Sequence, residues 1–166
     1  MSNSAHYALT VLFVCSSLSV HAQSTRVDIY SAQQLAASRP AGAKTSPQAA
    51  VSTEILQHYP NHYTMYVVRH GDGQSEWHRS MADAFFVLEG KAQLCSGGTM
   101  QGTKETAPGE RRGSGIDGAI CVPVKTGDVV HIPAGVPHQV RMTSGETLTY
   151  FVVKISEEAA EPRTAR

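Results

Sequence analysis

The chain has 166 residues with 14 basic and 14 acidic side chains, so its formal net charge is zero when the histidines are neutral. This balance gives no electrostatic reason to expect nucleic acid or an anionic membrane as a partner, and it favours a small neutral or weakly charged ligand. The length suits one domain with one hydrophobic core, even after removal of an N-terminal leader.

Residues 1–22 have the pattern of a secretion signal. The apolar run "ALTVLFVCSSL" is followed by Val20 and Ala22, small residues at the positions that precede a cleavage site. Cleavage would give a mature chain that starts near Gln23 and is secreted or periplasmic. The alternative is a disordered or membrane-anchoring N-terminus, but the run is shorter than the ~20 residues that a spanning helix needs.

Residues 23–54 are expected to form an N-terminal arm and linker. Ser31 is a suitable N-cap, Gln34 follows at the capping-box position and Pro40 closes the segment, so one short helix is predicted here. Residues 41–50 are small and polar without a periodic apolar face, which is typical of a loop.

From Ile55 onward the sequence changes to short segments rich in β-branched and aromatic residues, most of them bounded by Gly or Pro. They predict β-strands over residues 63–69, 84–90, 91–97, 119–124, 128–133, 138–143 and 147–155. Because no helical pattern lies between them, the predicted fold class is all-β, either a sandwich or a barrel. The charged, Ala-rich residues 156–166 are expected to form a flexible C-terminal tail.

A long connection, residues 98–118, separates two of these strands. It contains six glycines, one proline and the pair Arg111 and Arg112. Connections of this length are usually functional or mobile, and the alternative is a solvated hairpin extension without a role. If the connection folds over a barrel mouth, the two arginines could bind a carboxylate or phosphate.

Two cysteines, Cys95 and Cys121, flank this connection and remain after removal of the leader. In an oxidising compartment they could form a disulfide across it. The alternative is a pair of small buried apolar residues on neighbouring strands. The sequence leaves both possibilities open.

The stretch "GDVVHIPAGVPHQV" places a histidine behind a rigid turn. Pro133 ends a predicted strand, Gly135 permits a positive φ, and Pro137 stiffens the backbone that leads into His138. The imidazole of His138 would therefore lose little conformational entropy on binding a metal.

This stretch resembles the second signature of the cupin superfamily, G-x5-P-x-G-x2-H-x3-N. The matching residues follow one another without a gap: Gly127, Pro133, Gly135 and His138. Only the final Asn departs from the signature, since Met142 stands in its place. The resemblance implies a single cupin domain over residues 55–155, a double-stranded β-helix or jelly-roll barrel, with His138 as one metal ligand.

The first cupin signature, G-x5-H-x-H-x3,4-E-x6-G, resembles "EWHRSMADAFFVLEG" less closely. When Gly90 is taken as the closing glycine, Asp83 falls at the acidic position. His78 then stands at the second His, Glu76 replaces the first, and the opening Gly71 is one place out. Because Glu76 and His78 stand at i and i+2, both side chains can point into the barrel from one strand.

The resemblance thus implies a metal site made of Glu76, His78, Asp83 and His138. Two imidazoles with one or two carboxylates suit one divalent transition metal, Mn, Fe, Ni or Zn, and can leave coordination positions open. Asp83 has a shorter side chain than the usual Glu and reaches the metal either directly or through water. The alternative is a barrel without metal in which His138 is only a turn residue.

Two functions remain open. An enzyme would bind a small oxygen-rich molecule at the metal and use the metal as a Lewis acid for isomerase, lyase or oxygenase chemistry. A non-catalytic module would bind a small ligand or a sugar without turnover. The further candidates for the pocket are His131, Tyr66, Arg111 and Arg112. The resemblance also implies a homodimer, since cupins commonly pair through outer strands.

Overall fold

The computed structural model describes residues 27–38 and 50–157 of the chain. Within these residues lie one helix and twelve strands: α1 (Ala32–Ala37), β1 (Val51–His58), β2 (His62–Arg69), β3 (Ser75–His78), β4 (Met81–Ser96), β5 (Thr99–Gln101), β6 (Lys104–Ala107), β7 (Glu110–Gly113), β8 (Gly115–Asp117), β9 (Ile120–Lys125), β10 (Val129–Ile132), β11 (His138–Arg141) and β12 (Leu148–Ser156). The predicted all-β class is confirmed.

The predicted secretion signal, residues 1–22, lies outside the described residues. So does most of the predicted tail, although Ser156 still belongs to β12 and Glu157 donates its backbone N–H to the carbonyl of Ser80. Among residues 27–38 and 50–157, no helix is both long enough and apolar enough to cross a membrane.

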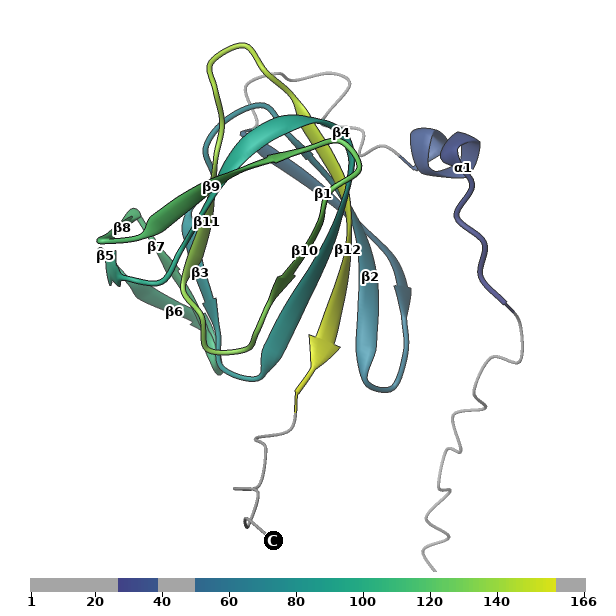
Figure 1. The fold of residues 1–166 in the computed structure, drawn as a ribbon. Helices are drawn as coiled ribbons and strands as arrows, with labels where there is room; N and C mark the ends of the chain where they lie inside the picture. The colour runs from purple at the N-terminus through teal and green to yellow at the C-terminus, as the bar shows by residue number, and fades with distance from the viewer. Residues whose placement is uncertain (1–26, 39–49, 158–166) are drawn as a thin grey trace, which may run out of the picture.

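Ten strands form one curled sheet that wraps into a barrel (Figure 1). Its order is β1-β2-β12-β4-β11-β3-β7-β6, and β9 and β10 also pair with β4. The sheet begins with β1 at Val51, ahead of Ile55, where the strand pattern was expected to start. β1 is an edge strand of this sheet, and its residues 51–54, "VSTE", are partly polar. This composition does not indicate a strand, so the sequence did not predict that β1 starts at Val51.

The long strand β4 belongs to both halves of the barrel. Its first part pairs with β10 and β12, and its second part pairs with β9 and β11. Between them, Gly90 has a φ of 89°, and a Cβ at this position would lie 1.9 Å from the carbonyl oxygen of Thr147. The two strands predicted at residues 84–90 and 91–97 are therefore one strand that bends at a glycine.

The long connection, residues 98–118, holds four short strands, β5 to β8, where a loop was expected. β7 pairs with β3, so that Arg112 lies opposite Glu76 and Glu110 lies opposite His78. Pairing satisfies backbone groups that a free loop would leave to solvent, and the Gly-rich composition hid the strands from sequence analysis. Through this pairing the segment reaches the predicted site.

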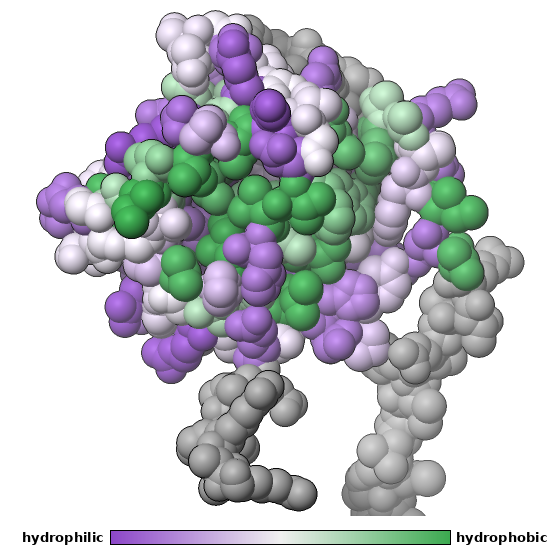
Figure 2. Space-filling model, in the orientation of Figure 1, coloured by the Kyte–Doolittle hydropathy of each residue, from purple (hydrophilic) through white to green (hydrophobic). Residues whose placement is uncertain are grey.

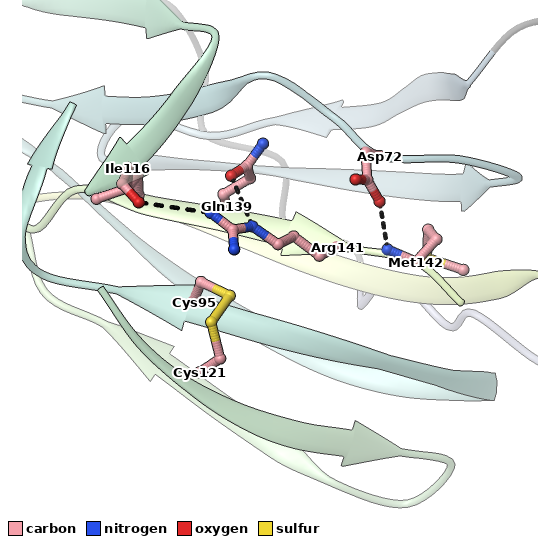
Figure 3. The surroundings of a disulfide bond; sticks show 7 residues. All are labelled: Asp72, Cys95, Ile116, Cys121, Gln139, Arg141 and Met142. Atoms are coloured by element: carbon pink, nitrogen blue, oxygen red, sulfur yellow. Dashed lines mark hydrogen bonds between the residues drawn. A yellow bond between two sulfur atoms is a disulfide. The ribbon is translucent and has the colours of Figure 1, made fainter. Parts of the chain in front are cut away.

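Of the two possibilities that the sequence left open for the cysteines, the structure has the disulfide: Cys95 on β4 and Cys121 on β9 are bonded (Figure 3). The two cysteines lie directly opposite each other in the β4–β9 pair, and Cys95 is fully buried. The bond ties together the two ends of residues 98–118, the segment that carries β7 to β3.

The short helix α1 has the predicted capping box, in which Ser31 accepts from the backbone N–H of Gln34 and the Gln34 side chain accepts from the backbone N–H of Ser31. Its apolar residue Leu35 packs against Tyr66 and Val68 on the outer face of β2. The arm therefore covers the outside of this chain's own barrel.

The main hydrophobic core lies inside the barrel. It is made of Val67, Phe85, Val87, Ala92, Leu94, Val124, Ile132, Val140, Leu148, Tyr150 and Val152. Figure 2 shows further apolar residues in the middle of one face of the molecule, with hydrophilic residues around them. Large exposed apolar side chains occur on β4, β9 and β10: Phe86, Leu88, Ile120, Val122 and Val129.

Candidate functional site

The structure brings together three of the four predicted ligands. Glu76 and His78 are two residues apart on β3 and therefore share one face of the strand. The register of β11 places His138 directly opposite Glu76. One ligand atom from each of these residues lies within 4.8 Å of the other two. Both histidine side chains are 3% exposed, so the cluster is largely closed to bulk water.

The fourth predicted ligand, Asp83, comes from β4 and is also buried. Its Oδ2 atom lies 3.3 Å from Nε2 of His138 and 3.6 Å from Nε2 of His78, and Nε2 of His78 lies 3.5 Å from Oε2 of Glu76. Ligands bound at about 2.0–2.2 Å in a tetrahedral or octahedral shell are about 3.0–3.5 Å apart. These three distances are compatible with ligands of one metal ion, and the group of mutually close ligand atoms consists of Glu76, His78 and His138.

Hydrogen bonds fix the tautomers of both imidazoles. Nδ1 of His138 lies 3.0 Å from the carbonyl oxygen of Val136, and Nδ1 of His78 lies 2.5 Å from the carboxylate of Glu110. Both oxygens only accept, so each Nδ1 carries the hydrogen and a neutral ring keeps its lone pair on Nε2. Both Nε2 atoms approach Asp83, which lies on the site side of each ring.

Lys154 on β12 supplies a cation to part of this cluster. Its Nζ atom lies 2.7 Å from Nε2 of His78 and 2.6 and 2.8 Å from the two carboxylate oxygens of Asp83. Only one proton fits between Nζ and Nε2, so Lys154 and His78 share one positive charge. Nε2 of His138 is buried and has no hydrogen-bond partner among the described residues.

Two carboxylates, the buried Asp83 and the partly exposed Glu76, are held in the ionised form. Burial raises the pKa of Asp83, but the nearby imidazoles of His138 and His78 outweigh this effect and hold the pKa well below its usual range. Burial likewise raises the pKa of Glu76, and the hydrogen bond to His78 and the charge of Arg112 lower it further than burial raises it. Both carboxylates are thus ready to bind a cation.

His78 is subject to opposing effects. Burial lowers its pKa, whereas hydrogen bonds to Asp83 and Glu76 raise it above its usual range, and the charge of Lys154 acts against them. The imidazole therefore competes with Lys154 for the proton between them.

A cavity of about 470 Å³ opens beside the cluster. Its wall includes Glu76, His78 and Asp83 from the cluster, and the hydroxyl-bearing side chains of Tyr63 and Tyr150. Apolar walls come from Met65, Val67, Phe85 and Val152. The volume lies in the range of small-molecule sites, and the mixture of apolar walls with a few polar groups is typical of them.

Of the four further pocket candidates, only Arg112 lines this cavity. Arg111 points to the other face of β7, where its guanidinium lies 4.7 Å from the ring centre of Trp77. Tyr66 packs against α1 outside the barrel, and His131 is exposed on β10. These three residues do not line this cavity, because successive side chains alternate between the faces of a strand.

Sequence analysis missed three charged residues of the site: Arg69, Glu110 and Lys154. Glu110 lies in the segment predicted as a loop, where nothing in the sequence indicates its direction. Lys154 did leave a signal, because β12 buries alternate residues and the lysine occupies the next inward position of this series: Leu148, Tyr150, Val152 and Lys154. A charged side chain at an inward position of an apolar strand marks a polar site.

No family model matches the sequence, and no curated protein matches it either. Solved structures do match the fold. An uncharacterized conserved protein with a double-stranded β-helix domain from Klebsiella pneumoniae is similar over 81% of this chain and 94% of its own, with a TM-score of 0.55 and 16% sequence identity. This chain has the cupin fold.

Two further structures are similar to this chain over shorter stretches. A cupin-2 domain from Rhodospirillum rubrum has 19% identity and a TM-score of 0.48, covering 69% of this chain and 65% of that one. The cupin domain of Cnp3 from Schizosaccharomyces pombe has 13% identity and a TM-score of 0.49, covering 66% and 67%. At these identities the likeness concerns the fold and carries no activity with it.

Proposed function

We propose that this cupin binds one divalent transition metal, Mn, Fe, Ni or Zn, through Glu76, His78 and His138, with Asp83 as a fourth ligand or as a partner of a metal-bound water. The observation that carries the proposal is the unpartnered Nε2 of His138, which faces the ionised Asp83 at 3.3 Å. When the ring is neutral, its Nε2 and the carboxylate are both acceptors, and a metal ion would take the place of the proton that otherwise links them.

The surroundings of His78 support the same role. Its Nδ1 donates to Glu110, an arrangement that orients the ring and makes Nε2 a better ligand. Lys154 contacts two of the proposed ligands, so its Nζ atom has to move away from His78 and Asp83 when the metal enters. The cavity gives the lysine side chain room to do so, because Lys154 lines it.

The cavity would hold a small oxygen-rich molecule next to the metal. A bound metal would act there as a Lewis acid that polarises an oxygen of this molecule. Tyr63 and Tyr150 line the same cavity and could orient the ligand through their hydroxyl groups. Isomerase, lyase and oxygenase chemistry all remain compatible with these groups.

A second candidate function is a metal-free module that binds a small ligand or a sugar without turnover. One observation favours it: the ammonium group of Lys154 already neutralises Asp83 at 2.6 Å and donates toward His78. In that case the lysine would be a permanent internal cation and would take the place that the metal has in the first proposal.

Export of this cupin to an oxidising compartment is part of the proposal. The disulfide between Cys95 and Cys121 supports it, since such bonds persist mainly outside the reducing cytosol. The homodimer also stays a prediction, and exposed apolar side chains on β4 and β10, such as Phe86 and Val129, offer a surface for it.

The first experiment is elemental analysis by plasma mass spectrometry on protein purified without chelator or metal-affinity resin. We expect about one Mn, Fe, Ni or Zn per chain, as for other sites with this donor set. The double variant H78A/H138A should retain none, because only carboxylates would remain. His131→Ala is the matched control and should keep its metal, since this histidine is exposed away from the site.

The outcomes separate the two candidate functions. Unchanged metal content in H78A/H138A would overturn the assignment of the ligands. A wild-type protein that takes up no metal, even after incubation with each of the four ions, would leave the metal-free binding module as the function.

A further inference from the structure

Arg69, at the end of β2, is a buried cation whose guanidinium group is only partly satisfied. Arg69 is 5% exposed, and its Nε donates to the hydroxyl oxygen of Tyr150 at 2.6 Å. Nη2 lies 3.4 Å from a carboxylate oxygen of Glu76, and Nη1 has no hydrogen-bond partner in residues 27–38 and 50–157. Because a buried N–H group without an acceptor is unfavourable, an acceptor from outside the chain would stabilise this arrangement.

The backbone around Gly73 leaves the space that Arg69 fills. A Cβ at position 73 would lie 1.9 Å from Nη1 of Arg69, so a larger residue there would displace the guanidinium from its present position. The segment is held in place from β11 and its end: the side chain of Gln139 donates to the carbonyl of Gly73 at 2.8 Å, and Asp72 accepts from the backbone N–H of Met142 (Figure 3). Arg69 and Gly73 both line the cavity, so this arginine belongs to its wall.

A second arginine approaches the same carboxylate from the opposite strand. Nη2 of Arg112 lies 3.5 Å from Oε2 of Glu76, and its Nη1 lies 3.4 Å from Oε2 of Glu110. Glu76 thus stands between two guanidinium groups, Arg69 and Arg112, and every contact is longer than the ~2.7–2.9 Å of a strong charge-assisted hydrogen bond. One carboxylate does not satisfy both groups.

The net charge of the cavity lining favours the binding of one anion once a metal is bound. Four carboxylates line it: Asp72, Glu76, Asp83 and Glu110. The positive charges are those of Arg69 and Arg112 and the one shared by His78 and Lys154. The metal-free cavity is therefore negative by one charge, and a divalent metal makes it positive by one. A single carboxylate would restore neutrality.

We propose that Arg69 and Arg112 bind the carboxylate group of a small monocarboxylate ligand, held in the cavity next to the metal. The inference rests on the proposed metal function, because a metal that binds Glu76 draws this carboxylate away from the two arginines. The planar fork of each guanidinium then finds its acceptors in the ligand, for which its geometry is suited. The ligand class thus becomes narrower, from oxygen-rich molecules to carboxylic acids.

The test is a calorimetric titration of the Mn²⁺-loaded protein with glycolate, and with the neutral glycolamide for comparison. Each variant is first titrated with Mn²⁺ alone, which reports on the metal site without any ligand. We expect glycolate to bind the wild type. Its affinity for R112M and for R69K should be at least about tenfold lower, which is the loss expected for a charged hydrogen bond. Arg111→Met is the matched control, since Arg111 lies over Trp77 on the other face of β7 and should leave glycolate binding unchanged.

Two variants guard against misfolding, because R69K keeps the buried charge and Arg112 is more exposed than Arg69. Glycolamide binding should not differ between the wild type and the arginine variants. If Mn²⁺ binds but glycolate has the same affinity for the wild type, R69K and R112M, this inference fails and the metal function stands. If Mn²⁺ does not bind at all, the metal function fails and this inference fails with it.

Discussion

The two histidines of the site are equally buried, yet they are held in different ways. His138 is oriented by the carbonyl of Val136, two residues earlier in the same turn, and its Nε2 has no hydrogen-bond partner among the described residues. His78 is oriented by Glu110 and contacted by Lys154, residues that β7 and β12 bring from distant parts of the chain.

The two rings therefore differ in how available they are to a metal. The lone pair of His138 is free for a cation, and no competing group has to leave. The lone pair of His78 already has a partner, so metal binding at this ring must break its contact with Lys154. The free Nε2 of His138 therefore supports metal binding. The contact between His78 and Lys154 determines how tightly the metal would be held.

The largest expected effect comes from removal of either ring. His138→Ala and His78→Ala should each weaken metal binding by more than about 100-fold, beyond the loss that follows from mutation of an outer-shell partner. Calorimetric titration with Mn²⁺ and Zn²⁺ measures this, with His131→Ala as the control. A His138→Ala variant that binds metal as well as the wild type would show that His138 is only a turn residue.

The next effect concerns the orienting partner of His78. Glu110→Gln should weaken metal binding by about 10–100-fold, because the carboxylate that orients the ring and strengthens Nε2 as a ligand is lost. Glu54→Gln, at an exposed glutamate on β1, is the matched control for the same titration. An unchanged affinity in E110Q would mean that the backbone alone holds His78 in place.

Removal of the competing cation should act in the opposite direction. Lys154→Met keeps much of the side-chain volume and takes the ammonium away from His78 and Asp83, so metal affinity should rise about tenfold, equivalent to one lost charged hydrogen bond. The metal-free variant should also melt at a lower temperature, because Asp83 is left buried without its partner.

Lys125→Met, at an exposed lysine on β9, is the control for charge removal alone. Weaker metal binding in K154M would contradict the competition between lysine and metal. It would instead favour the metal-free module, in which Lys154 is a fixed part of the ligand site.

The same contrast explains what sequence analysis could predict. The surroundings of His138 are local: a glycine and two prolines within a few residues fix its backbone, so the signature alone was enough to predict it as a candidate ligand. The spacing of Glu76 and His78, two residues apart on β3, is also a local feature of the sequence. The partners Glu110 and Arg69 depend on strand pairing over long separations, which no local pattern specifies. Lys154 did leave a local signal, its inward position on β12, but its contacts with His78 and Asp83 also depend on this pairing. For the same reason Arg111 and Arg112 could not be told apart before β7 was known to pair with β3.

The smallest expected effect is an acid-dependent loss of stability in the metal-free protein, due to Asp83. The pKa of this carboxyl is depressed in the folded state from its usual 3.8, so its contribution to the free energy of unfolding is present above that value and is lost as the pH falls below about 4. Urea unfolding between pH 6 and pH 3 should show a steeper fall for the wild type than for D83N. Asp72→Asn is the control at an exposed carboxylate of the cavity rim, and it should keep the wild-type slope. An equally steep fall in D83N would mean that Asp83 is not held ionised by the two imidazoles, and the case for a cation between Asp83 and His138 would lose its electrostatic basis.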